Sequence, residues 1–256
     1  MLLLIGLGLA TKDLSLRALE EIKNADTLLL ETYTAFIPND YIDFLEKQSG
    51  KRPALLKRND LEENVKQTVA MAKDKNIVIL VPGDPLIATT HAIILNEAKK
   101  QGIKCEVIHA PSIFSIAIGE SGLDVYKFGP TVTIPFWSER YRPTSFIDAI
   151  QRNMQNGQHT IILLDIDHKN SMPMRISEAL EIIKEAQATK GTEILGAEAR
   201  IIIMANLGRE DKTIKYLKIA EVGADISKEL EGKQISLIVP GSLSFAEEEN
   251  LRRATS

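Results

Sequence analysis

The chain has 256 residues, enough for one large domain or two smaller domains with a substantial hydrophobic core. Its 31 Lys and Arg residues against 35 Asp and Glu residues give a formal net charge of −4, so no general attraction for nucleic acid or anionic membranes is predicted. The single cysteine, Cys105, excludes an intramolecular disulfide, and its surroundings, IKCEVIH, predict a buried and unreactive thiol.

The N-terminal segment MLLLIGLGLA predicts a first buried strand at residues 2–5 rather than a secretion signal. No basic segment precedes it, and it continues into a helical pattern without a small-residue cleavage site. No other apolar run approaches the roughly 18–20 residues that a membrane-spanning helix needs. We therefore expect a soluble, cytoplasmic protein without a membrane partner.

The first half of the chain predicts strands that alternate with amphipathic helices. Strands are expected at residues 2–5, 27–31, 77–81 and 105–108, and helices at residues 14–25, 59–75 and 90–101. Leu16 belongs to the predicted apolar face of the first helix, and Asn59 with Glu62 predicts a capping box for the second. Near-continuous apolar strands separated by helices indicate a mostly parallel sheet covered on both faces.

The pattern changes beyond about residue 122. Strands are predicted at residues 131–136, 160–165, 200–205, 213–219 and 235–239, and helices at residues 144–154 and 176–186. Because helices separate only some of these strands, the second sheet is predicted to be mixed. The expected fold is α/β with two domains, residues 1–122 around the mostly parallel sheet and residues 123–256 around the mixed sheet.

Two glycine turns follow predicted buried strands. Gly6 and Gly8 lie in GLGL after the first strand, and Gly83 and Asp84 lie in VPGDPL after the strand at residues 77–81. A glycine at the carboxyl end of a strand lets main-chain atoms approach a ligand closely, and ligands of open α/β sheets bind where strands end. The turns therefore predict a small polar cofactor beside Gly83 and Asp84. From the pattern alone, a simple strand-to-helix connection is an equal alternative.

The remaining polar residues favour neither a metal site nor a hydrolase. The four histidines have no metal-ligand spacing and no accompanying cysteine, so no metal is predicted; they are His91, His109, His159 and His168. The strings GxSxG, GxxxxGK[ST] and HExxH do not occur in the sequence, which leaves serine hydrolysis, phosphoryl transfer and zinc hydrolysis without a motif.

One dinucleotide motif is incomplete. Glu31 ends the second predicted strand, where the ribose of a nicotinamide cofactor would bind, but Thr11 occupies the position of the third glycine in GxGxxG. A nicotinamide-dependent oxidoreductase therefore remains an alternative, as does a binding protein without enzymatic activity.

Longer strings resemble the diphthine synthases, which belong to the tetrapyrrole-methylase superfamily. They are IGLGLATKDLSLRALEEIKNAD, LETYT, VPGDPLIATTH, HAPSIFSIAIGESGLDVYKFG and HTIILLDID, in this order over essentially the whole chain. The GLGL and GDP strings are shared across the superfamily, whereas ATTH, HAPSI, YKFG and LLDI are specific to diphthine synthases. A tetrapyrrole (precorrin-type) methyltransferase is therefore the nearest alternative.

The resemblance implies an S-adenosylmethionine-dependent methyltransferase with a cofactor cleft between its two domains and a homodimeric assembly. Its implied substrate is a histidine of translation elongation factor 2 that carries a 3-amino-3-carboxypropyl group, whose amino nitrogen is methylated during diphthamide biosynthesis. The short connection between Leu164 and the helix at residue 176 is similar to that of compact archaeal members, which stop at the trimethylated product. No catalytic residue is assigned, because the sulfonium donor is already activated and the amine is the nucleophile.

The resemblance also implies a set of cofactor contacts in the GLGL, GDPLI, HAPSI, LLDI and ANLG strings and before the final strand. These contacts are Leu9, Asp84, Ile87, Ser112, Ile113, Leu164, Leu207 and Ile235. Asn206 and Gln234 stand where diphthine synthases often have Arg and His, so Leu207 and Ile235 are expected to contact the cofactor through their main chain. Apolar contacts suit adenine, which needs flat apolar walls.

Overall fold

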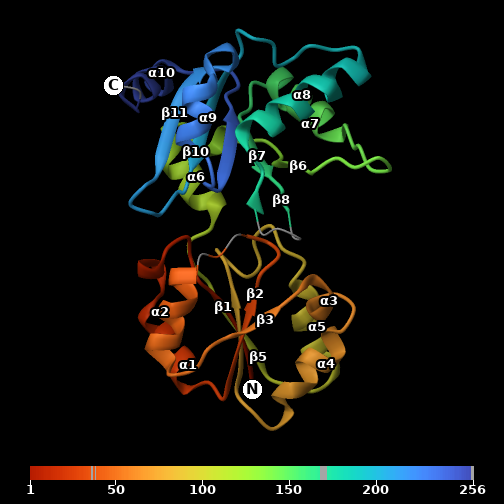
Figure 1. Ribbon diagram of the computed structural model, residues 1–256, viewed down its shortest axis with the longest axis vertical. Coiled ribbons are helices and arrows are strands. Elements are labelled where there is room, and N and C mark those ends of the chain that lie inside the picture. Colours follow the sequence, from red (N-terminus) through yellow and green to blue (C-terminus); the bar gives the residue numbers. More distant parts are fainter. Residues whose placement is uncertain (36, 38, 168–171, 255–256) are drawn as a thin grey trace. The chain divides into compact units, whose positions relative to one another are not determined.

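The computed structural model describes residues 1–35, 37, 39–167 and 172–254; His168 lies outside these residues. The chain forms two compact units, Met1–Ile113 and Phe114–Ser256, each with its own sheet (Figure 1). The predicted boundary after residue 122 lies at the far end of helix α6 (Ile113–Ser121). This helix is held by the second unit, because Glu120 pairs with Lys212 at 2.6 Å and the Gly122 carbonyl accepts a 3.0 Å hydrogen bond from Asn250.

The first unit contains an all-parallel sheet in the order β3-β2-β4-β1-β5. Its strands are β1 (Leu2–Gly6), β2 (Thr27–Glu31), β3 (Ala54–Leu56), β4 (Ile77–Val81) and β5 (Cys105–Ile108). Every residue of β1 and β4 is buried. Helices α1 (Leu16–Asn24) and α2 (Asn39–Ser49) cover one face of the sheet, and α4 (Val65–Ala70) and α5 (Ala92–Lys100) cover the other (Figure 1). Burial on both faces confirms the predicted parallel sheet and explains its continuous apolar strands.

The first helix begins later than predicted. After the short helical turn η1 (Thr11–Asp13), helix α1 spans Leu16–Asn24, and the Ser15 side chain accepts a 3.1 Å hydrogen bond from the Ala18 N–H as the N-cap. Leu16 is therefore the first helical residue and is 87% exposed, so its predicted place on the apolar face is wrong. Ala18 and Ile22 form the buried face instead.

The predicted capping box at Asn59 and Glu62 is also wrong. Helix α3 (Arg58–Leu61) begins after Lys57, whose N–H donates to Oδ2 of Asp60 at 2.7 Å. The helix ends at Leu61, and a separate helix α4 (Val65–Ala70) and the turn η2 (Met71–Lys73) follow. The sequence predicts a single helix over this segment. The remaining helices of this unit are α2 (Asn39–Ser49) and α5 (Ala92–Lys100).

The second unit contains the predicted mixed sheet, in the order β11-β10-β12-β7-β6. Only β6 and β7 pair in parallel; the strands are β6 (Val132–Ile134), β7 (Thr160–Leu164), β10 (Arg200–Ala205), β11 (Thr213–Lys218) and β12 (Ile235–Val239). A short ribbon of β8 (Ile166–Asp167) and β9 (Met172–Pro173) follows β7.

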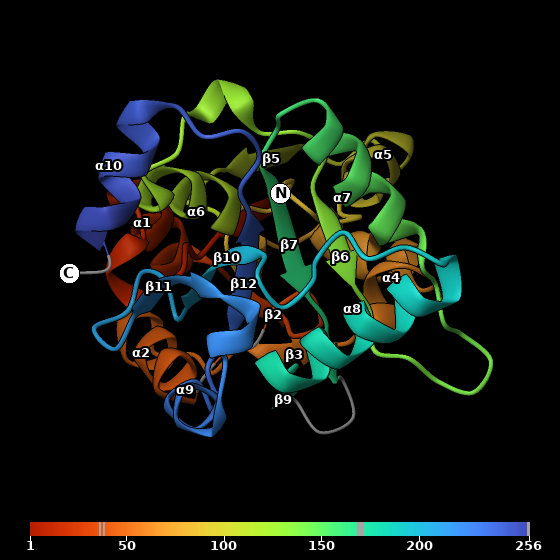
Figure 2. The same cartoon turned by 90° about the horizontal axis from the view of Figure 1, so that it is seen from above.

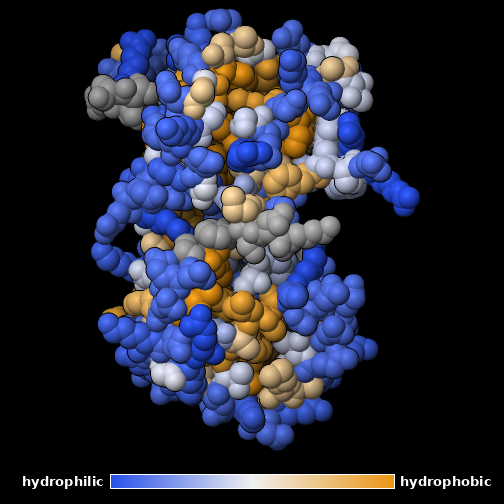
Figure 3. All heavy atoms as spheres, in the orientation of Figure 1, coloured by the Kyte–Doolittle hydropathy of each residue, from blue (hydrophilic) through white to orange (hydrophobic). Residues whose placement is uncertain are grey.

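Helices cover the mixed sheet as well. Helices α7 (Ser145–Gln155) and α8 (Ile176–Lys190) lie side by side and share one hydrophobic core with the strands, while α10 (Phe245–Ala254) contacts β11 (Figure 2). Short helical segments η3 (Val125–Lys127), η4 (Ile219–Glu221) and α9 (Ala224–Glu229) complete the unit. In the view of Figure 3, hydrophobic side chains show over the strands of each unit, and hydrophilic side chains cover the flanking helices.

A buried polar cluster joins the last helix to the start of β7. The Glu247 carboxylate, 3% exposed, accepts hydrogen bonds from Nζ of Lys127, from Nε2 of His159 at 2.8 Å and from the Asp124 N–H at 3.0 Å. Nδ1 of His159 accepts the Gly241 N–H at 2.9 Å, and burial lowers the pKa of this histidine, so the imidazole is neutral. Burial alone would raise the pKa of Glu247, but these donors hold it well below its usual range.

This cluster predicts a specific loss of stability. Glu247→Gln removes the buried negative charge that accepts the hydrogen bonds from Lys127 and His159, which should lower the free energy of unfolding by about 3 kcal/mol. Urea denaturation followed by the fluorescence of the single tryptophan, Trp137 in the second unit, measures the change. Because the folded pKa of Glu247 lies below its ordinary 4.5, its stabilisation is present above that pH and declines as the pH falls through the folded value.

Glu248→Gln is the matched control. Glu248 is on the same helix but half exposed and paired only loosely with Arg252, at 3.7 Å, so its replacement should change stability by less than ~0.5 kcal/mol. Equal losses for the two variants would contradict a stabilising role for the buried cluster.

Candidate functional site

Five of the eight predicted cofactor residues lie at one edge of the first sheet. Strands β4, β1 and β5 are neighbours and run in parallel, so their carboxyl ends meet at this edge. Leu9 follows β1, Asp84 and Ile87 follow β4, and Ser112 and Ile113 follow β5. Loops at the carboxyl ends of parallel strands are the usual place for ligands in open α/β sheets.

The two glycine turns at this edge are bonded to each other. The Gly8 N–H donates to the Gly83 carbonyl at 3.2 Å, and the Gly83 N–H donates to the Gly8 carbonyl at 2.9 Å. Gly8 and Gly83 have φ angles of 69° and 67°, in the left-handed region that favours glycine. Gly6 must be glycine for a steric reason, because a Cβ at this position would lie 2.7 Å from the Gly83 carbonyl oxygen.

Gly83 differs from Gly6 in what surrounds it. Among the described residues, the atom that a Cβ at Gly83 would meet is Cα of Ser112, at an ordinary 3.8 Å. Close packing therefore requires glycine at positions 6 and 8, whereas at the buried Gly83 the described neighbours leave room for a Cβ and only the left-handed φ favours glycine.

Asp84 fastens the loop after β4 to the loop after β5. Its side chain is buried; Oδ1 accepts the Leu86 N–H at 2.9 Å, and Oδ2 accepts the Ala110 N–H at 3.2 Å and a 2.8 Å hydrogen bond from Nδ1 of His109. Both carboxylate oxygens are therefore engaged within the protein. The side chain of Asp84 therefore orients the turn, and its main-chain carbonyl accepts the Ile87 N–H at 3.4 Å.

The other three predicted cofactor residues lie at one edge of the second sheet. Leu164 ends β7, Leu207 follows β10, and Ile235 begins β12, which runs antiparallel to both strands. The register pairs Ile235 with Ala205 at the end of β10. The side chains of Leu207 and Ile235 are buried in the unit, which is compatible with the expected contacts through their main chain.

The two departures from the family pattern bind each other. Asn206 has a φ of 48°, and its N–H donates to the Gln234 carbonyl at 2.9 Å while its Oδ1 accepts the Gln234 N–H at 3.0 Å. Its amide also donates to Asp211 at 2.8 Å. Asparagine tolerates the left-handed region better than most residues, so Asn206 holds the turn before Leu207. The sequence alone does not indicate this pairing, because it joins residues far apart in the chain.

Glu31 is fully buried within its own turn. Its carboxylate accepts the N–H groups of Tyr33 and Thr34, the latter at 2.6 Å, and the Thr34 hydroxyl. Burial raises the pKa of Glu31 despite these bonds. Because these bonds engage the carboxylate inside the protein, Glu31 is not positioned to hydrogen-bond to the ribose of a cofactor. The geometry therefore disfavours the nicotinamide-dependent alternative.

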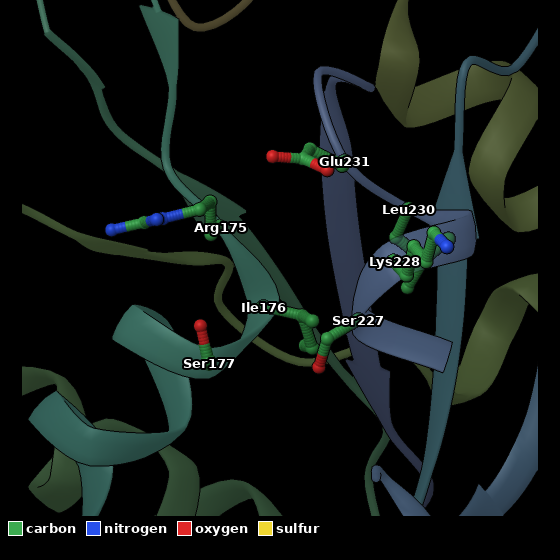
Figure 4. A pocket seen from close by; sticks show the side chains of 7 residues that line it. All are labelled: Arg175, Ile176, Ser177, Ser227, Lys228, Leu230 and Glu231. Atoms are coloured by element: carbon green, nitrogen blue, oxygen red, sulfur yellow. The ribbon is translucent and has the colours of Figure 1, made fainter. Parts of the chain in front are cut away.

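A separate pocket of about 190 Å³ lies in the second unit between the start of α8 and the end of α9 (Figure 4). Its lining comprises Arg175, Ile176, Ser177, Ser227, Lys228, Leu230 and Glu231. The cationic ends of Arg175 and Lys228 point away from each other in Figure 4, and Arg175 is paired with Glu178 at 2.8 Å. The lining includes no predicted cofactor residue, and its charged groups do not converge, so we do not assign the pocket to the reaction.

Within the part of the chain that the structure describes, no three potential ligands gather into a metal site. No helix in those residues is long and apolar enough to cross a membrane. Cys105 is only partly buried, less than predicted, and burial raises the pKa of its thiol to about 11, which disfavours the reactive thiolate.

Comparison with known proteins identifies relatives over nearly the whole chain. Residues 1–223 match the family model of the Tetrapyrrole (Corrin/Porphyrin) Methylases. The chain is 37% identical to the diphthine synthase of Methanocaldococcus jannaschii, over 98% of both chains, and 34% identical to that of Methanothermobacter thermautotrophicus, over 98% of this chain and 94% of the relative. A crystal structure of a diphthine synthase superimposes with a TM-score of 0.85 at 31% identity, covering 100% of this chain and 96% of the other.

The packing at Gly83, where a Cβ would lie no closer than 3.8 Å to a described neighbour, predicts a selective loss of ligand binding on substitution. Gly83→Val places a branched side chain where a ligand would approach the backbone. We expect the affinity for S-adenosylhomocysteine, the product form of the implied cofactor, to fall about tenfold or more, or ~1.4 kcal/mol. Calorimetric titration of the folded variant measures this affinity.

Gly102→Val is the matched control for backbone strain. Gly102 follows the far end of α5 and has a φ of 68°, and no described atom lies within 4 Å of the place that a Cβ would take there. Both variants carry the same left-handed penalty of about 1–2 kcal/mol. Wild-type affinity in the Gly83 variant would remove this turn from the binding site.

Proposed function

This chain belongs to the diphthine synthases of the tetrapyrrole methylase family, and we propose from that premise that it methylates the 3-amino-3-carboxypropyl histidine of translation elongation factor 2. Membership makes it an S-adenosylmethionine-dependent methyltransferase. The observation that carries the proposed substrate is 37% identity to a diphthine synthase over 98% of both chains. The same similarity disfavours a precorrin-type tetrapyrrole substrate.

The proposed cofactor contacts come from both units. In the first unit, the main chain of Gly83 and Asp84 would hold the polar part of S-adenosylmethionine, with Leu9 and Ile87 as apolar contacts. The side chain of Ile87 is 44% exposed, so it is accessible for contact with a ligand. Ser112 and Ile113 of the first unit and Leu164, Leu207 and Ile235 of the second complete the proposed set. That the cofactor lies between the two domains stays a prediction.

When bound, the cofactor supplies a methyl group on a sulfonium, which is already activated for in-line displacement. The task of the protein is then to hold the acceptor nitrogen about 3–3.5 Å from the methyl carbon and to exclude water, a contribution on the order of 7–11 kcal/mol in favourable systems. The acceptor amine must be unprotonated for the transfer, and a dry site favours this state because it disfavours the ammonium ion. No protein nucleophile is needed.

We assign no general base. Asp84 and His91 are the titratable side chains nearest to the turn in sequence, and both are buried and hydrogen-bonded within the protein. Neither is therefore available to take a proton from the substrate. The geometry instead gives them a positioning role around the turn.

The proposed product is the trimethylated amine. Residues 165–175 connect Leu164 to α8. The resemblance implies that a connection of this kind belongs to the compact archaeal members, which stop at the trimethylated product. The third transfer converts a tertiary amine to a quaternary one, which ends N-methylation because no lone pair remains.

The homodimer implied by the resemblance is part of the proposal. So is a cytoplasmic location, because the proposed substrate is a translation factor.

Mass spectrometry of elongation factor 2 tests the proposal. The factor carrying the 3-amino-3-carboxypropyl histidine should gain the mass of three methyl groups after incubation with this protein and S-adenosylmethionine. The factor with an unmodified histidine is the control and should gain none. An unchanged mass of the modified factor would contradict the proposed substrate, and a fourth, alkali-labile methyl group would contradict the proposed product.

A further inference from the structure

The loop between β4 and α5 contains a residue in a strained conformation. Ala88, next to Ile87, has a φ of 56°, in the left-handed region where an alanine costs about 1–2 kcal/mol. Ile87 itself is 44% exposed, so this part of the loop gains little from core packing. Specific interactions must therefore hold the loop in this shape.

The carbonyl of Pro85 receives two of these interactions. Oγ1 of Thr89 donates to it at 2.7 Å, and Nδ1 of His91 lies 3.1 Å from it. His91 is fully buried, and its other ring nitrogen, Nε2, lies 3.2 Å from the hydroxyl of Tyr33. Tyr33 belongs to the segment after β2, the strand beside β4. A chain of hydrogen bonds thus runs from that segment to the strained loop.

The direction of this chain follows from its chemistry. Burial lowers the pKa of His91 and, together with the nearby Glu31, raises the pKa of Tyr33 to about 12, so both groups are neutral. A carbonyl only accepts, so the proton of the imidazole lies on Nδ1 and points to Pro85. Nε2 then carries a lone pair and accepts from the Tyr33 hydroxyl. The Thr90 side chain also hydrogen-bonds Tyr33, beside this chain of hydrogen bonds.

We propose that Tyr33, Thr89 and His91 are positioning residues that shape the β4–α5 loop for the cofactor. They act on the Pro85 carbonyl, which lies between Asp84 and Ile87, the two proposed contacts in this loop. The proposal rests on the proposed cofactor site and adds residues that do not themselves touch the cofactor. It also gives a role to the ETYT and ATTH strings, which the proposed contacts leave unused.

The test compares variants that remove or restore each hydrogen bond. His91→Leu removes both bonds of the imidazole, and Tyr33→Phe removes only the hydroxyl. His91→Asn retains a donor close to the position of Nδ1. Thr89→Val leaves the imidazole of His91 in place but removes the second donor to Pro85, together with the 3.4 Å hydrogen bond that Oγ1 accepts from the His91 N–H; Thr89→Ser retains both bonds. The Thr89 pair keeps the test decisive if the buried histidine cannot be replaced without unfolding.

The dissociation constant for S-adenosylhomocysteine should rise about fivefold in Tyr33→Phe and Thr89→Val and about tenfold or more in His91→Leu. His91→Asn and Thr89→Ser should recover most of the affinity. In the methylation assay, KM for the cofactor should rise while kcat at saturating cofactor stays near wild type, a split that general loss of folded protein would not produce.

Two results overturn the proposal. Wild-type affinity in folded Thr89→Val, or in folded His91→Leu, would show that the loop keeps its shape without these bonds, while the cofactor site would stand. Failure of the wild-type protein itself to bind S-adenosylhomocysteine would overturn the cofactor site and the positioning role together. The titration does not use elongation factor 2, so its outcome is independent of the proposed substrate.

Discussion

The reciprocal hydrogen bonds between Gly8 and Gly83 are the constraint on which the proposed site depends. They join the turns after β1 and β4, two central strands of a sheet that is buried on both faces. Gly6 allows this approach because any side chain there would meet the Gly83 carbonyl. Asp84 then hydrogen-bonds to the neighbouring loop after β5, so the loops that follow these three strands are linked to one another. We propose that the ligand-binding surface is made largely by main chain, which would explain why the proposed contacts are mostly apolar residues.

Elements with strong local signals could be predicted from the sequence. The bounds of β2, β4, β5, β10 and β12 agree with the prediction, because each is an apolar run that ends at a turn. The start of a helix depends on which residue caps its first turn, and the local sequence pattern predicts the wrong starting residue for α1 and α3. Ser15 rather than the preceding residues starts α1, and Lys57 with Asp60 starts α3. The position of Gly83 at a strand end was predictable for the same reason as the strands.

Interactions between distant residues could not be predicted. The sequence places Asp84 at the turn, but its partners His109 and Ala110 come from another loop. Likewise, Glu31 stands where a ribose-binding carboxylate would be expected, and only the structure shows that its own turn occupies it. The family-specific YKFG string is also informative. Its Lys127 and the nearby His159 both hydrogen-bond Glu247 at the opposite end of β7 from Leu164. A family-specific string can therefore serve the fold rather than the reaction.

A crystal structure of the protein with S-adenosylhomocysteine tests the central claim most directly. The claim is that the edge formed by the turns after β1, β4 and β5 binds the cofactor chiefly through main chain. The account predicts ligand density against Gly83, Asp84 and Ile87, with Leu9 and Ser112 beside it and the Gly8–Gly83 pairing intact. Density away from this edge, with the Gly83 main chain uncovered, would contradict it.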